Sequence, residues 1–102
     1  MKPRAIAYAP EARGDLLALY DRIADVASSN VALAYVLRVE AWLSGFDVGS
    51  ERGTRRDDVR PGLRVIGFER RLTVAFTVEA DRVVILRVFQ AGRDWGEAFG
   101  EI

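Results

Sequence analysis

The sequence has no cysteine and no histidine in its 102 residues, and its only lysine is Lys2. Without cysteine, the chain can form neither a disulfide framework nor a thiolate zinc site. Without histidine, it lacks the imidazole used by most Ser-His-Asp and Cys-His catalytic sites and by many metal centres. We therefore expect no metal, no cofactor and no catalytic residue of these classes.

Long apolar runs are also missing. No stretch approaches the roughly 18 to 20 apolar residues that a membrane-spanning helix needs. The apolar stretch that follows Lys2 and Arg4 is too short for the core of a signal peptide. We expect a cytoplasmic protein that does not associate with membranes, folded as one domain over residues 1–102.

The formal net charge is zero, but the charges are distributed unevenly. Residues 1–51 carry five basic and seven acidic groups, whereas residues 52–93 carry ten arginines and five acidic groups. Residues 94–102 add three acidic groups and no basic one. The densest cluster is at 51–71, where seven of 21 residues are arginine, so any electrostatic function belongs to the second half of the chain.

The spacing of apolar residues changes once along the chain. A short strand is expected at 4–8, and apolar residues then recur at helical spacing over about 10–28 and again over 32–43. The polar residues at 28–30 between them have side chains that can cap a helix, so the two helices should form an antiparallel hairpin.

From residue 63 the apolar period becomes two. This alternation predicts strands at 63–68, 72–78 and 82–89, and the short turns between them predict an antiparallel meander. The fold class is therefore α+β, with the order β-α-α-β-β-β. We expect an antiparallel sheet with the helical hairpin packed on one face.

Three segments, taken in order, resemble a ParE-type toxin of the RelE/ParE superfamily, which belongs to bacterial type II toxin–antitoxin pairs. The helical segments 10–24 and 32–46 come first. The most specific parts are RDDVRPGLRVIGFERR at 56–71 and VVILRVFQAGRD at 83–94. The resemblance covers roughly residues 5–95 and implies the same RelE/ParE-like domain, with the tail 93–102 outside the last strand.

This resemblance implies a toxin that arrests growth by binding and inhibiting a cellular target, expected to be DNA gyrase. It also implies neutralisation by a cognate ParD-like antitoxin in a hetero-oligomer, a heterotetramer or larger. Operator DNA would be bound only through the antitoxin, whose C-terminal part would wrap around the toxin.

A second possibility is a ribosome-dependent mRNA endonuclease of the RelE type. Such an enzyme must move protons, typically with a tyrosine or histidine near its C-terminus, and here the three tyrosines are Tyr8, Tyr20 and Tyr35. Arginine stabilises charge but is a poor proton shuttle, which favours inhibition by binding. A decayed toxin that acts only as an antitoxin-binding scaffold is the third possibility.

The arginine cluster allows three interpretations. Arg55 and Arg56 could pair with Asp57 and Asp58 and fasten a loop against the sheet. Alternatively, arginines of the cluster could contact an acidic antitoxin segment, since arginine binds carboxylates in a bidentate manner. The third is contact with the target or with nucleic acid. We expect Arg60 and Arg64 to be the first available to the antitoxin.

Other candidate contacts lie on the helices, on the last strand and in the tail. Arg87 interrupts an apolar strand, so it either pairs with a carboxylate or opens into a groove that the antitoxin covers. Leu19 and Tyr35 are expected on the outward side of the helices, in contact with the antitoxin. The predicted target-binding residues are Arg93, Asp94, Trp95 and Phe99.

Overall fold

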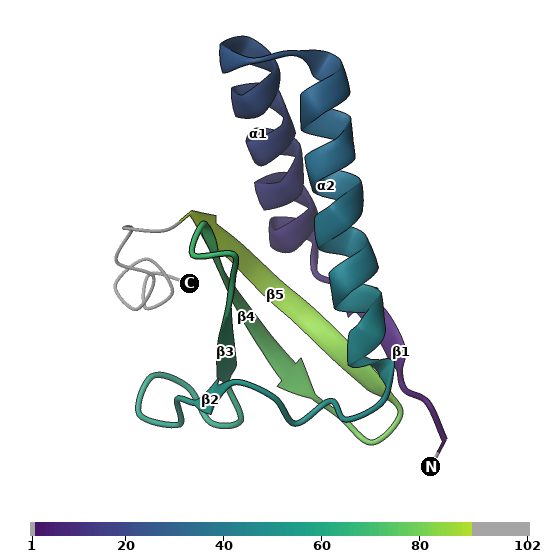
Figure 1. The fold of residues 1–102 in the computed structure, drawn as a ribbon. Coiled ribbons are helices and arrows are strands. Elements are labelled where there is room, and N and C mark those ends of the chain that lie inside the picture. The colour runs from purple at the N-terminus through teal and green to yellow at the C-terminus, as the bar shows by residue number, and fades with distance from the viewer. Residues whose placement is uncertain (1, 91–102) are drawn as a thin grey trace.

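The computed structural model describes residues 2–90 and places a helical hairpin on one face of a twisted sheet (Figure 1). The elements, in chain order, are β1 (Ala5–Tyr8), α1 (Pro10–Val26), α2 (Ser29–Ser44), the 3₁₀ turn η1 (Gly45–Asp47), β2 (Thr54–Arg55), β3 (Arg64–Phe68), β4 (Leu72–Val78) and β5 (Arg82–Gln90). This order confirms the predicted α+β class and adds one short strand, β2, that the sequence pattern did not reveal.

The helical hairpin follows from local chemistry. Pro10 begins α1, where its missing N–H and fixed φ are compatible with a first helical turn. The Ser28 hydroxyl accepts a hydrogen bond from the Val31 amide at 3.1 Å and so caps α2. Only two residues separate the helices, which forces them into the antiparallel arrangement that was predicted.

The sheet has the strand order β1-β5-β4-β3-β2. The meander of β3, β4 and β5 is antiparallel, as predicted. The expectation of an entirely antiparallel sheet was wrong, because β1 pairs with β5 in parallel, from Ala5 opposite Arg82 to Tyr8 opposite Ile85. Parallel pairing requires a long crossover, and the helices together with β2 to β4 supply it.

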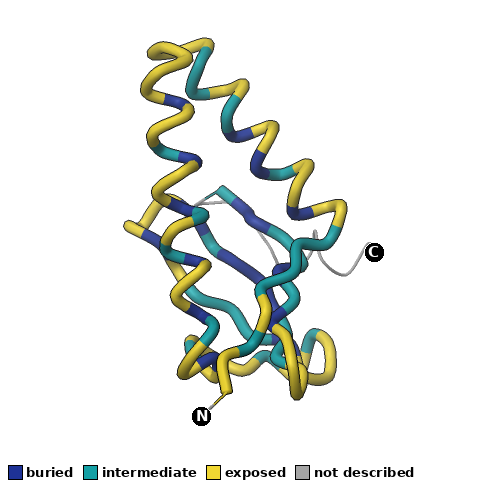
Figure 2. The backbone as a smooth tube through the Cα atoms, turned by 90° about the vertical axis from the view of Figure 1, so that its right-hand side faces the viewer, coloured by how far each residue is buried: buried dark blue, intermediate teal, exposed yellow. Residues whose placement is uncertain are grey.

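The main core lies between the hairpin and the sheet, and buried positions line the inward sides of both (Figure 2). Its aromatic centre is continuous: the ring of Trp42 lies 4.9 Å from that of Phe46 and 4.7 Å from that of Phe68. Trp42 is half-buried at the boundary between helix and sheet. A smaller cluster around Leu63, Ala75 and Phe89 covers part of the other face.

A β-bulge interrupts β5 at Leu86. Ala75 of β4 pairs with Arg87, but the next residue, Phe76, pairs with Ile85. The extra residue reverses the alternation of side chains along the strand. Ile85 therefore belongs to the main core, whereas Arg87 stacks over the ring of Phe89 at 4.7 Å. Regular alternation along a strand would put Ile85 and Arg87 on the same face, and the bulge separates them.

Asp15 of α1 binds the part of β5 that β1 does not cover. Its carboxylate accepts hydrogen bonds from Arg87 Nε at 2.8 Å, from Arg87 Nη2 at 3.0 Å and from the Val88 amide at 2.8 Å. The side chains of Arg87 and Asp15 are only 16% and 17% exposed. Of the two alternatives for Arg87, the structure therefore shows the carboxylate pair, and this pair raises the pKa of the guanidinium.

We predict that Asp15→Ala destabilises the protein by about 2–4 kcal/mol, because it leaves a mostly buried guanidinium and the Val88 amide without their acceptor. Asp15→Asn retains one acceptor oxygen and should cost less. Chemical denaturation followed by circular dichroism measures the free energy of unfolding of each variant.

Asp21→Ala provides the matched control, because Asp21 is an exposed carboxylate on the same helix. Its effect should stay within about 0.5 kcal/mol. Equal losses in the Asp15 and Asp21 variants would show that the hydrogen bonds to β5 contribute nothing specific.

Candidate functional site

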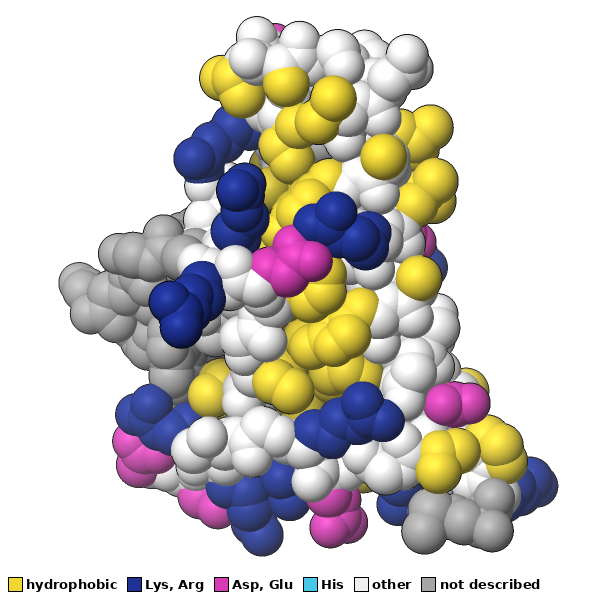
Figure 3. Space-filling model, viewed as in Figure 1, with side chains coloured by type: hydrophobic (Ala, Val, Ile, Leu, Met, Phe, Trp, Pro, Cys, Tyr) yellow, Lys and Arg dark blue, Asp and Glu magenta, His cyan; other side chains and the backbone are white. Residues whose placement is uncertain are grey.

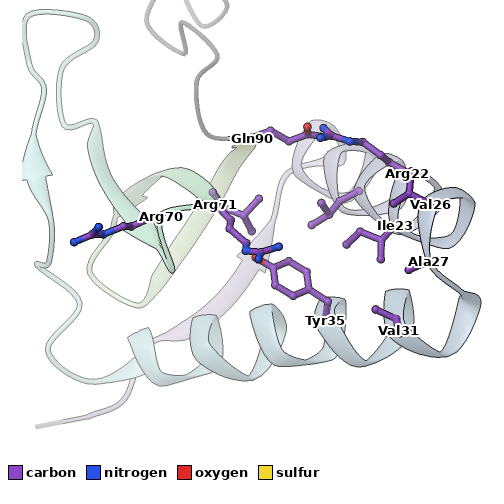
Figure 4. Close-up of a pocket in the computed structure, with 11 residues that line it drawn as sticks. Arg22, Ile23, Val26, Ala27, Val31, Tyr35, Arg70, Arg71 and Gln90 are labelled. Carbon is purple, nitrogen blue, oxygen red and sulfur yellow. The ribbon is translucent and has the colours of Figure 1, made fainter.

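A cleft of about 490 Å³ opens between the end of α1, the start of α2 and the turn that joins β3 to β4 (Figure 4). Its walls come from the helical hairpin, from the turn and the first residue of β4, and from the last residue of β5. The lining residues are Leu19, Arg22, Ile23, Val26, Ala27, Val31, Tyr35, Arg70, Arg71, Leu72 and Gln90. Figure 1 shows why it forms: the helical hairpin extends beyond the end of the sheet.

Most of the cleft lining is apolar. Leu19 and Leu72 are buried at its base, Ile23 is half-buried, and Val26 and Val31 are 81% and 52% exposed. The prediction that Leu19 points outward was wrong, because its side chain belongs to the main core and is 7% exposed. Leu19 lies one helical turn after Asp15, so it faces the same side of α1. The exposed valines nevertheless leave apolar surface at the mouth of the cleft.

Arginines stand at the rim of the cleft. Figure 4 shows Arg22 reaching from α1 towards Gln90, and Arg71 reaching towards the ring of Tyr35, whereas the guanidinium of Arg70 points away. No residue within the described range 2–90 forms an ion pair with Arg22 or Arg71. Figure 3 shows the same face as an apolar strip flanked by basic side chains. The rim therefore offers positive charge above an apolar floor.

The hydroxyl of Tyr35 is buried in this region, and no described residue hydrogen-bonds to it. Burial raises the pKa of this hydroxyl, and the nearby Glu69 raises it further. The guanidinium of Arg38 lies over the Tyr35 ring, 4.9 Å from its centroid. A buried donor without a partner costs free energy, and the Tyr35 hydroxyl is such a donor among the described residues.

The turn between β3 and β4 has an unusual backbone. Glu69 and Arg70 have φ angles of +52° and +59°, and the Arg71 amide donates to the Phe68 carbonyl at 2.9 Å. This is the conformation of a type I′ hairpin turn, which normally selects Asn and Gly. Here the turn sets Glu69 against Arg38 of α2, with which it forms an ion pair, and it places Arg71 at the cleft.

We predict that Arg70→Gly stabilises the protein by about 0.5–1 kcal/mol, because glycine adopts a positive φ without steric cost. Thermal and chemical denaturation measure the change. Arg71→Gly serves as the control, since Arg71 does not have a positive φ. An equal gain in both variants would mean that removal of charge, and not of backbone strain, is responsible.

The loop at 51–64 fastens itself with its own ion pairs. Arg55 forms two hydrogen bonds to Asp57, at 3.0 and 3.2 Å, and Arg56 forms two to Asp58, at 2.9 and 2.8 Å. Asp57 also accepts from the Gly62 amide at 2.8 Å. The first of the three interpretations, in which Arg55 and Arg56 pair with Asp57 and Asp58, is therefore confirmed, and these pairs neutralise two arginines within the loop.

Two further arginines of the cluster bind backbone carbonyls. Arg52 donates to the carbonyls of Gly45, Val48 and Gly49 at 2.6–2.7 Å, and so satisfies acceptors left at the end of α2 and η1. Arg64 donates to the Arg52 carbonyl at 3.2 Å. Arg87 and Arg64 thus have different partners on opposite sides of β4, and the described contacts do not join them into one basic site.

We predict that the loop loosens in acid. The Gly62 amide and Arg55 hold the pKa of Asp57 below its ordinary value of 3.8. A depressed carboxyl pKa adds stability that is fully present above the ordinary value and is lost as the pH falls through the lower, folded value. Hydrogen exchange or the NMR shift of the Gly62 amide should follow this transition. In Asp57→Asn, the transition should disappear.

Sequence reasoning found part of this site. It identified Leu19 and Tyr35, which both line the cleft, but it missed Arg22 and Arg71, which the hairpin and the type I′ turn bring there. Arg60 lies in the loop, outside the cleft lining. The predicted target-binding residues Arg93, Asp94, Trp95 and Phe99 lie outside the described residues.

Among residues 2–90, no group of three or more Asp or Glu side chains is placed to hold a metal ion. Within the same range, neither helix combines the length and the apolar character needed to cross a bilayer.

Comparison with known proteins identifies the family. Residues 6–95 match the sequence model of a protein family, which is described as the ParE toxin of the type II toxin–antitoxin system parDE. Among solved structures, the chain resembles a protein of the chromosomal ParDE toxin–antitoxin system from P. aeruginosa with a TM-score of 0.75. The two are 24% identical, and the match covers 86% of this chain and 96% of the other. A comparison with curated proteins found no match.

Proposed function

Because the chain belongs to the ParE toxin family of type II toxin–antitoxin systems, we propose that it arrests growth by binding and inhibiting DNA gyrase. A cognate ParD-like antitoxin neutralises it in a hetero-oligomer, a heterotetramer or larger. The toxin acts in the cytoplasm, and operator DNA is bound only by the antitoxin. Inhibition proceeds by binding, without catalysis.

The antitoxin surface includes the cleft between α1, α2 and the β3–β4 turn. The observation that supports this assignment is the coexistence of exposed apolar side chains, two arginines without an ion pair in the described chain, and the unsatisfied Tyr35 hydroxyl. An amphipathic segment with carboxylates matches all three features, because it would cover the valines, pair with Arg22 and Arg71, and accept from Tyr35.

The other predicted contacts keep different roles in this proposal. Arg60 and Arg64 are secondary antitoxin contacts, and Arg64 lines a smaller hollow with Glu51 and Arg55. Arg87 acts indirectly, since Asp15 engages its guanidinium and thereby holds α1 in place. Leu19 contributes the floor of the cleft. Arg93, Asp94, Trp95 and Phe99 contact the target.

We predict that induction of the protein without its antitoxin stops growth, with loss of plasmid supercoiling before protein synthesis falls. Supercoiling and incorporation of labelled amino acids, followed in parallel, measure this order. Immediate loss of translation with codon-biased mRNA cleavage would instead support an endonuclease. Continued growth with abundant folded protein would support a scaffold that retains only antitoxin binding.

In the same experiment, co-expression of the antitoxin tests whether the antitoxin binds the cleft. The double variant Arg22→Glu, Arg71→Glu should remain toxic but escape neutralisation, because its rim repels carboxylates. Lys2→Glu is the control, since Lys2 is an exposed cation that does not line the cleft. Normal neutralisation of the double variant would show that the antitoxin does not depend on the cleft.

A further inference from the structure

The outer face of α2 differs from an ordinary solvated helix surface. α2 contains only two charged residues, Arg38 and Glu40, and Arg38 is paired with Glu69. The exposed charged residues of the neighbouring α1 are Glu11, Arg13, Asp21, Arg22 and Asp25. Residues 11–20 and 31–40 nevertheless show the same order of buried and exposed positions. A helix that is nearly uncharged all round is typical of one that is covered on all sides.

A seam of uncharged residues runs along the exposed side of α2. Successive seam residues are 4, 3, 4 and 3 positions apart, which is the heptad spacing of residues that face a partner helix in a coiled coil. The seam residues, all exposed, are Asn30, Ala34, Leu37, Ala41 and Ser44. Leu37 is 54% exposed. This side of α2 faces away from the sheet, and no element of the described residues 2–90 lies over it (Figure 1).

The seam reads almost the same in both directions. Leu37 is at its centre, an alanine lies on each side, and a small polar residue stands at each end. When two such seams run antiparallel about a two-fold axis near Leu37, the large side chain of each copy meets the alanines of the other. A partner of different sequence would not require this symmetry. The seam therefore identifies a second copy of the chain as its occupant.

The polar groups of the seam are compatible with such a contact. None of the five residues is charged, so two copies do not repel each other along the seam. The Ser44 hydroxyl donates to the Glu40 carbonyl of its own helix at 2.9 Å. Burial of Ser44 therefore leaves no donor without a partner. The charge of Arg38, which lies next to Leu37 in the sequence, is already engaged by Glu69.

We propose that the protein self-associates through α2 as a two-fold symmetric dimer, with the two α2 helices antiparallel. α2 has 16 residues and is about 24 Å long. A contact along one helix of this length is at the small end of specific interfaces, which bury about 1,200–2,000 Å² in total, so the dimer dissociates in the micromolar range. None of the seam residues lines the cleft, so the dimer leaves the cleft open.

Sedimentation of the purified protein over a range of concentrations tests this association. We expect a reversible monomer–dimer equilibrium. Ala34→Glu and Leu37→Glu should each weaken dimerisation by about tenfold or more, because each dimer would bury two carboxylates without partners. Both side chains are exposed in the monomer, so the variants should keep the fold, which circular dichroism checks.

Ala18→Glu is the matched control, because Ala18 is an exposed alanine on α1 and lies outside the seam. It adds the same charge and should leave the dissociation constant of the dimer unchanged. Equal weakening in the Ala18 and Ala34 variants would overturn the proposal. So would a protein that is monomeric at every concentration, and if its seam variants then failed only in antitoxin binding, the face would belong to the antitoxin.

The orientation of the helices can be tested separately, because the chain has no cysteine of its own. In the antiparallel dimer, residue 30 of one copy lies beside residue 44 of the other, whereas the two copies of residue 30 are about 21 Å apart along the axis. A short bismaleimide should therefore link a mixture of Asn30→Cys and Ser44→Cys but not Asn30→Cys alone. Efficient linking of Asn30→Cys to itself would overturn the antiparallel dimer. These measurements use the protein alone, so they are independent of its target and of its antitoxin.

Discussion

The carboxylate of Asp15 accepts three hydrogen bonds from β5, and the relation of the helices to the sheet depends on them. Because β1 ends at Tyr8, the second half of β5 has an open edge where the Val88 amide would lack a partner. Apolar packing alone is non-directional and would let α1 slide over the sheet. The bonds from Arg87 and Val88 fix its position along β5.

The cleft is a consequence of that fixed position. α1 has 17 residues and is therefore roughly 25 Å long, and Asp15 anchors it near its first turns. The apolar side of α1 continues through Leu19 and Ile23 to Val26, beyond the point where β5 ends at Gln90. The stripe that forms the core near Asp15 thus becomes exposed surface at the far end of the helix, and this surface is the cleft.

Structural features that depend on local periodicity could be predicted from the sequence. Features that depend on contacts between residues far apart in the chain could not. Apolar spacing located both helices and the strands of the meander. It could not reveal the parallel pairing of β1, or that the bulge at Leu86 moves Arg87 off the face of Ile85. The partner of Arg87 lies 72 residues away, at Asp15, and sequence spacing does not indicate such a pair.

The difference between local and distant pairing also explains which arginines remain available at the cleft. Arg55 and Arg56 each pair with a carboxylate two residues further along the chain. Arg71 has a carboxylate at the same separation, Glu69, but the left-handed conformation of Glu69 and Arg70 directs Glu69 to Arg38 on α2. Arg71 is therefore left without that carboxylate by the geometry of one turn. The strained backbone of this turn thus keeps Glu69 away from Arg71, and the charge of Arg71 lies at the cleft.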